Sequence, residues 1–87
     1  MFYVYVIKSR KDNKLYIGYS SDLKKRLESH NKGGVKSTKS RVNFDLIYYE
    51  AYASMSDAKT REKQIKRFSG SYNHLKKRIS NSLILFK

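Results

Sequence analysis

The sequence predicts an α+β fold in a single domain of residues 1–87, with three strands and with helices after the second and third of them. Two observations predict it. Three short runs combine β-branched and aromatic residues, as strands do, and polar stretches with turn formers separate them. Segments after the second and third runs place apolar residues four apart, the spacing of one helix face. A chain of this length suffices for one small domain with a modest core.

The first two strands form a predicted hairpin. Residues 2–7 alternate between two sets of apolar side chains, which is typical of a strand whose faces are used differently. Residues 11–14, Lys-Asp-Asn-Lys, tolerate unusual backbone angles, and the apolar pattern resumes over residues 15–19. The two strands are therefore expected to pair antiparallel.

A helix and a polar loop are expected next. Residues 20–22, Ser-Ser-Asp, are candidate N-caps of a helix whose apolar positions are Leu23 and Leu27. This helix should end near residues 31–34, Asn-Lys-Gly-Gly, after about three turns. Residues 33–43 are basic, rich in Ser and Thr and without a packing pattern, which predicts an exposed loop.

The second half of the chain predicts one strand and at least two helices. Residues 44–52, rich in Leu, Ile and Tyr, form the third strand. Ser56 is expected to cap a helix that Gly70 ends, and Ser71 to cap another. The apolar positions of these helices are Ala58, Ile65, Phe68, Leu75 and Ile79. Residues 83–86 are either a docked tail or a short additional element, and periodicity leaves both open.

The charge of the chain indicates a polyanionic partner. It carries 20 Lys and Arg against 7 Asp and Glu, a net charge of +13, which is more than solubility requires. Nucleic acid is the first candidate and an anionic membrane surface the second. No stretch approaches the ~18 apolar residues that span a bilayer, and the chain starts in a strand-like run without a basic leader, so we expect a cytoplasmic protein. Cysteine is absent and histidine occurs twice, which leaves mainly oxygen ligands for any catalytic metal.

Two tripeptides and three single residues follow one another at specific spacings. Residues 3–5, Tyr-Val-Tyr, are separated by ten residues from residues 16–18, Tyr-Ile-Gly. Arg26 lies eight residues beyond the second tripeptide, and His30 four beyond Arg26. Together with Glu62, this set resembles the GIY-YIG nuclease superfamily. It is most similar to the small single-domain bacterial members, which are grouped with the nuclease domain of the excision-repair endonuclease.

The resemblance implies both a fold and an activity. The fold would be a three-stranded antiparallel sheet flanked by helices. The activity would be that of an endonuclease that hydrolyses phosphodiester bonds with one divalent cation, Mg²⁺ or Mn²⁺. The substrate could be DNA or RNA, with DNA as the first candidate in keeping with a role in DNA repair, and a protein partner could direct substrate choice. We see no dimerisation seam, which predicts a monomer.

The resemblance also assigns five catalytic residues. Tyr5 would be the general base for the attacking water, which requires a lowered pKa that Arg26 and a metal ion could supply. Tyr16, on the paired strand, would bond the phosphate or the water. Arg26 would bind phosphate, and His30, on the same helix face, would orient Tyr5 or accept its proton. Glu62, the last acidic residue in the chain, would be the metal ligand.

Each of these roles has an alternative in ordinary packing. The two tyrosines could be strand aromatics that stabilise the sheet. The arginine could be a solvated surface charge, and the histidine a favourable cation at a helix C-terminus. Glu62 could form an intrahelical ion pair with Lys66.

The remaining positive charge predicts contacts with backbone phosphates that do not depend on base sequence. The predicted nucleic-acid contacts are Lys36, Lys39, Arg41, Lys66, Arg67, Asn73, Lys76, Lys77 and Arg78, of which Asn73 comes from the resemblance. Tyr48, Tyr49 and Tyr52 are either stacking platforms for unpaired bases or ordinary core and sheet surface. Two alternatives to the enzyme remain: a non-catalytic module that binds RNA or DNA, and a basic protein of membrane surfaces.

Overall fold

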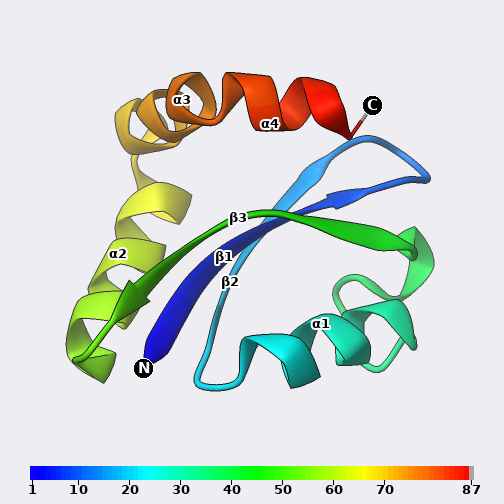
Figure 1. Cartoon of the computed structure of the whole chain (residues 1–87), viewed down its shortest axis with the longest axis horizontal. Coiled ribbons are helices and arrows are strands. Elements are labelled where there is room, and N and C mark those ends of the chain that lie inside the picture. The colour runs from blue at the N-terminus through cyan, green and yellow to red at the C-terminus, as the bar shows by residue number, and fades with distance from the viewer. Residues whose placement is uncertain (87) are drawn as a thin grey trace.

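The computed structural model describes residues 1–86 and contains a three-stranded sheet with helices on both faces (Figure 1). The strands are β1 (Phe2–Ser9), β2 (Leu15–Ser20) and β3 (Phe44–Tyr52), arranged in the order β2-β1-β3. The central strand β1 pairs antiparallel with both neighbours. The predicted α+β class, the hairpin and the third strand are confirmed.

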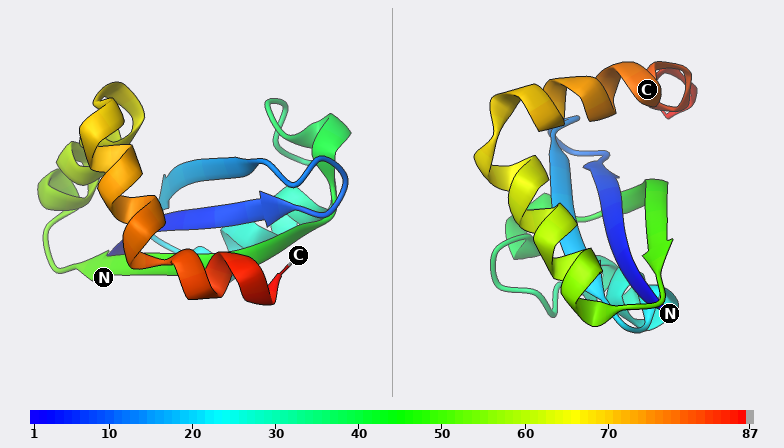
Figure 2. Two further views of the ribbon diagram at one scale, coloured as in Figure 1. Left: turned by 90° about the horizontal axis from the view of Figure 1, so that it is seen from above. Right: turned by 90° about the vertical axis from the view of Figure 1, so that its left-hand side faces the viewer.

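Helices cover the two faces of this sheet unequally (Figure 2). One face packs against α1 (Leu23–Asn31), and the other packs against α2 (Met55–Arg67), α3 (Ser69–Arg78) and the end of α4 (Ser80–Leu85). Because helices pack on both faces of the sheet, the side chains of the central strand β1 are buried in two separate cores. The first core contains Val4, Val6, Ile17, Ala58, Ile65, Leu75 and Ile79, and the second contains Tyr5, Ile7 and Phe44.

The hairpin and the first helix begin where their sequence signals predict. Asn13 adopts a φ of 60° in the turn between β1 and β2, a conformation that asparagine tolerates better than most residues. Asp22 caps α1, since its carboxylate accepts a hydrogen bond from the Lys25 backbone N–H at 3.1 Å. Leu23 and Leu27 pack on the second core, which fixes the helix face that looks at the sheet.

The predicted caps of the next two helices are wrong. Ser54, not Ser56, caps α2 through a hydrogen bond to the Asp57 N–H, which places Ser56 within the first turn. Helix α2 ends at Arg67 because Phe68 is extended, and α3 then starts at Ser69, so that Gly70 and Ser71 lie inside it. The open question at the C-terminus is settled by α4, a short helix.

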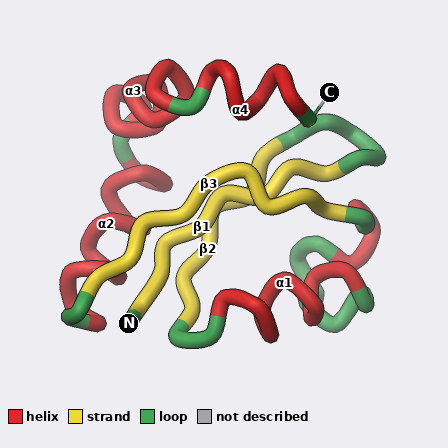
Figure 3. The backbone as a smooth tube through the Cα atoms, viewed as in Figure 1, coloured by secondary structure: helices red, strands yellow, loops and turns green. Residues whose placement is uncertain are grey.

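The connection between α1 and β3 is only partly the exposed loop predicted from its composition (Figure 3). It contains a short 3-10 helix, η1 (Lys39–Arg41), and Thr38 just before this helix is completely buried. Val42 of this segment packs on the second core, whereas Thr38 is held by hydrogen bonds with His30 and Val35, so no hydrophobic pattern marks Thr38 as buried. Among residues 1–86, no helix is both long and apolar enough to cross a membrane.

Candidate active site

The Tyr5 hydroxyl lies between two polar side chains of α1. It is 2.8 Å from Nε2 of His30, and Nε of Arg26 donates to it at 3.4 Å. Arg26 and His30 share a helix face because they are four residues apart, and Leu23 and Leu27 hold that helix against the sheet. The structure therefore brings three of the five predicted catalytic residues into one hydrogen-bonded cluster.

Tyr16 completes the aromatic part of this cluster from β2. Its ring lies 5.0 Å from the His30 ring and 6.4 Å from the Tyr5 ring, measured between centroids. Tyr5 reaches this position because it faces Gly18 across the β1–β2 ladder. A Cβ atom at residue 18 would overlap the Tyr5 hydroxyl and ring, so only glycine leaves room for the tyrosine.

Thr38 joins the cluster and was not predicted from the sequence. Its Oγ1 lies 2.7 Å from Nδ1 of His30 and donates to the Val35 carbonyl at 3.4 Å. In the His30 tautomer that carries its proton on Nδ1, this nitrogen would donate to Thr38, and Nε2 would accept from the Tyr5 hydroxyl. The sequence gives only a weak signal for Thr38, namely a small hydroxyl residue in a polar loop eight positions after His30.

Burial decides the charge of the two groups at the centre. It lowers the pKa of His30 to about 4, with a further contribution from the Arg26 charge, so His30 is neutral near pH 7. Burial also raises the pKa of Tyr5 above its ordinary value, although the hydrogen bond and charge of Arg26 act in the opposite direction. The expected lowering by Arg26 is thus present, but without the contribution expected from a metal ion burial outweighs it.

His30 should make stability depend on pH. Its pKa is near 6.5 in an unfolded chain and about 4 in the fold, so the unfolded state binds the additional proton as the pH falls. We expect the free energy of unfolding to decrease between about pH 6.5 and 5, by at most about 1.4 kcal/mol per pH unit. Urea unfolding across this range should show the slope in wild type and in His74→Gln, at an exposed histidine, and lose it in His30→Gln. A slope unchanged in His30→Gln would contradict the assignment.

Glu62 lies at the edge of the cluster, on α2. Its carboxylate is close enough for its charge to raise the pKa of both Tyr5 and Arg26. Nζ of Lys66 contacts one oxygen at 3.4 Å and also lies 5.6 Å from the centre of the Tyr16 ring. The intrahelical ion pair weighed as an alternative is thus present, in a partly exposed position where it is worth only a few tenths of a kcal/mol.

The donor set at Glu62 fits a hard divalent cation that is bound together with a substrate. Among residues 1–86, no group of three or more His, Asp or Glu side chains is placed to hold a metal ion. Mg²⁺ is commonly bound by one or two carboxylates, with waters and substrate phosphates as its other ligands. Glu62 supplies one such carboxylate, which is partly exposed and, among residues 1–86, is bonded by Lys66 alone, at 3.4 Å.

The other predicted nucleic-acid contacts are not all available to a ligand. Arg41 donates to Asp12 at 2.9 Å and lies over the Phe44 ring, so it braces the fold. Exposed positions are occupied by Lys36, Lys39, Lys66, Arg67, Asn73, Lys76, Lys77 and Arg78. No hydrogen bond among residues 1–86 connects Asn73 to the cluster.

The tyrosines of β3 separate into two groups. Tyr48 and Tyr52 donate to the Glu50 carboxylate, which also pairs with Arg61 of α2 at 2.9 Å. Tyr49 is half exposed on the opposite face and packs edge to face on Tyr3. The first two tyrosines are therefore structural.

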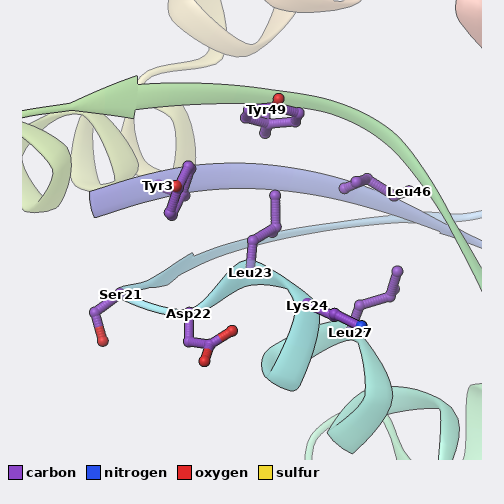
Figure 4. Close-up of a pocket in the computed structure, with 8 residues that line it drawn as sticks. All are labelled: Tyr3, Ser21, Asp22, Leu23, Lys24, Leu27, Leu46 and Tyr49. Atoms are coloured by element: carbon purple, nitrogen blue, oxygen red, sulfur yellow. The ribbon is translucent and has the colours of Figure 1, made fainter. Parts of the chain in front are cut away.

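A cavity of about 510 Å³ lies beside the polar cluster rather than in it. Figure 4 shows Tyr3 and Tyr49 of the sheet facing Leu23 of α1 across this space. None of the five predicted catalytic residues lines it. The cluster itself lies between α1 and strands β1 and β2: Tyr5 and His30 are buried, and Tyr16 and Arg26 are partly exposed.

Comparison with known proteins assigns the chain to a class. A model of the GIY-YIG catalytic domain matches residues 1–76, which contain both tripeptides, Arg26, His30 and Glu62. The chain belongs to the GIY-YIG family, which supports a nuclease-type function.

Its relatives are small bacterial proteins. The chain is 47% identical over 68 residues to a UPF0213 protein of Staphylococcus haemolyticus, a match that covers 77% of this chain and 82% of the relative. It is 40% identical over 70 residues to a UPF0213 protein of Clostridium perfringens, covering 79% and 74% of the two chains. The solution structure of a UPF0213 protein from Bacillus halodurans is similar, with a TM-score of 0.53, 31% identity and coverage of 86% and 81%.

Proposed function

We propose that this protein is an endonuclease that hydrolyses phosphodiester bonds of nucleic acid, with DNA as its substrate and Mg²⁺ or Mn²⁺ as its cofactor. The observation that carries the proposal is the Tyr5 hydroxyl between the Arg26 guanidinium and the neutral His30. Such a hydroxyl can accept a proton from water and pass its own to Nε2 in one movement. A buried structural tyrosine needs one hydrogen-bond partner for its hydroxyl, whereas Tyr5 has two.

The proton has a continuous path through these side chains. As the water oxygen forms its bond to phosphorus, its proton goes to Tyr5 Oη and the Tyr5 proton goes to Nε2 of His30. The bond between phosphorus and the leaving oxygen breaks, and the leaving oxygen takes up a proton from solvent. His30 then releases its proton through Tyr5 to solvent as the products leave. The relay uses the His30 tautomer that is protonated at Nδ1, in which Nδ1 would donate to Thr38 and Nε2 is free to accept the proton. Because Tyr5 stays neutral before reaction, the relay replaces a preformed phenolate base.

Arg26 and Glu62 would act on the phosphate. The contact of Arg26 with Tyr5 uses Nε, which leaves the two Nη groups to bond two phosphate oxygens. Glu62 would hold the divalent cation, which when bound stabilises the negative charge on the phosphoryl and leaving oxygens. Tyr16 would bond the phosphate or the water at the open side of the cluster.

Removal of the Tyr5 hydroxyl is the direct test. We expect Tyr5→Phe to keep the fold and to lower the rate of cleavage by about a hundredfold or more, since it removes the proton relay alone. The assay uses labelled single-stranded, duplex and branched DNA and a structured RNA, with Mg²⁺, Mn²⁺ or chelator. Tyr49→Phe, which removes a half-exposed hydroxyl outside the cluster, is the matched control.

Two results would overturn the proposal. Wild-type cleavage that persists in chelator would contradict the metal dependence. Binding of the nucleic acids without cleavage of any of them would favour the alternative, a module that only binds nucleic acid.

A further inference from the structure

Two cavities lie along the face of β2 that looks toward α2 and α3. One, of about 380 Å³, includes Lys66 and Arg67 in its wall, and the other, of about 460 Å³, includes Lys8 and Lys76. Leu15 and Tyr72 line both cavities. We call these two cavities and the residues named here the β2 groove.

The β2 groove is positively charged, and none of the described residues that line it carries a negative charge. Among the described residues that line the two cavities, five are Lys or Arg when Lys14 is included, and none is Asp or Glu. Lys76 also lies 5.2 Å from the centre of the Tyr72 ring, which joins a cation to an aromatic surface. A groove of this kind suits an anion that also carries flat, apolar groups.

Lys8 is the strongest sign that an anion belongs there. The residue is only 8% exposed, and its ammonium donates to the Leu83 carbonyl at a long 3.4 Å. Asp45, its neighbour across β3, has both carboxylate oxygens bonded by Arg10. In the described residues Lys8 therefore has no carboxylate within ion-pair distance. Its charge contributes to the lowered pKa of Asp45, but this carboxylate is bonded by Arg10, and burying a charge without a direct ion pair is costly.

The groove leads to the candidate active site through Lys66. This side chain lines the nearer cavity, contacts Glu62 and lies over the ring of Tyr16. An anionic chain that starts at the phosphate bound by Arg26 can therefore continue past Lys66 into the groove. Neighbouring phosphates would meet Arg67 and Lys76 in turn.

We propose that the β2 groove binds an unpaired strand of nucleic acid next to the scissile phosphodiester, an inference that rests on the proposed function. Lys66, Arg67 and Lys76 bind successive phosphates, Lys8 binds the phosphate at the far end, and Tyr72 contacts a base. Cavities of a few hundred Å³ beside a partly buried aromatic ring admit single nucleotides, and stacking of bases on aromatic rings is the usual mode for single strands. Paired bases in a duplex cannot offer their faces to Tyr72.

The test measures binding alone, in chelator, so that no cleavage is needed. Fluorescence anisotropy compares a labelled single-stranded DNA with the duplex of the same sequence. We expect tighter binding of the single strand, and for this strand a loss of about fivefold or more in Lys76→Ala and in Tyr72→Leu. Lys25→Ala, at an exposed lysine of α1 that lines neither cavity, should change affinity by less than about twofold.

Lys8→Met gives a second test, in which thermal stability and single-strand affinity should change in opposite directions. The free protein should become more stable to heat, because a buried charge is replaced by an apolar side chain of similar length, while single-strand affinity falls. Equal losses of affinity in the Lys76 and Lys25 variants, or equal affinity for the single strand and the duplex, would overturn the proposal that the β2 groove binds the strand. If the groove variants lose single-strand binding but the wild-type protein cleaves no substrate, the binding groove stands and only the proposed nuclease activity is overturned.

Discussion

Replacing Glu62 by glutamine is expected to reduce metal-dependent cleavage by at least about a thousandfold, because the carboxylate is the ligand proposed for the cation that stabilises the phosphoryl oxygens. Glutamine has the same shape and keeps the helix. The loss of the partly exposed contact with Lys66 should cost only about 0.5 kcal/mol or less in the free energy of unfolding. Initial rates with Mg²⁺ and urea unfolding of the same samples measure the two effects.

The alternative role of Glu62 makes a different prediction. If the ion pair with Lys66 were its only function, Glu62→Gln and Lys66→Met would have similar, small effects on cleavage. We expect instead that Glu62→Gln abolishes cleavage, whereas Lys66→Met mainly weakens binding. Glu28→Gln, at an exposed carboxylate of α1, controls for the change in net charge. Cleavage by Glu62→Gln at the rate of Glu28→Gln would remove the metal assignment.

The strands and helix faces could be predicted because their buried positions recur in the sequence with the period of a strand or a helix. Val4 and Val6 alternate with Tyr5 and Ile7, and both sets are buried in β1, one on each face. The four-residue spacing of Leu23 and Leu27 likewise marked the buried side of α1. Helix ends were less predictable, since Ser54 and Ser56 are equally good caps and only the path of the chain out of β3 selects the first.

The polar residues of the candidate site could be predicted only in part. The spacing of Arg26 and His30 predicts that they share a helix face, and Tyr5 was placed beside them by resemblance. Thr38, which contacts the other ring nitrogen of His30, lies in a polar loop and is buried through hydrogen bonds. No hydrophobic periodicity in the sequence therefore identifies it. The direction of the Tyr5 pKa depends on how far burial outweighs Arg26, and that balance requires the three-dimensional arrangement.

Lys8 was missed for a related reason. In the sequence it continues the alternation of β1 toward a polar turn, where a lysine is expected to be exposed. In the structure the end of α3 and α4 cover that side of the strand, and Leu83 of α4 accepts its hydrogen bond. The existence of α4 could not be decided from periodicity, so the burial of Lys8 could not be predicted either.

Gly18→Ala is expected to disrupt the active site and to destabilise the fold by about 2 to 3 kcal/mol. The new Cβ would overlap the hydroxyl and ring of Tyr5, whose side chain is 1% exposed and has no room to retreat. Movement of that ring would break its contacts with His30 and Arg26, so cleavage should fall as far as in Tyr5→Phe. Urea unfolding measures the first effect and the cleavage assay the second.

Gly70→Ala separates this clash from the general effect of removing a glycine. At Gly70 an added Cβ meets nothing within 4 Å, and the residue lies in the first turn of α3, so alanine there should be neutral or stabilising by up to about 1 kcal/mol. The same substitution thus has opposite signs at the two positions. If the Tyr5 ring causes the loss at Gly18, the change should cost less in a Tyr5→Leu background. An equal cost in both backgrounds would place the strain in the β2 backbone, and Gly18 would then have no part in positioning Tyr5.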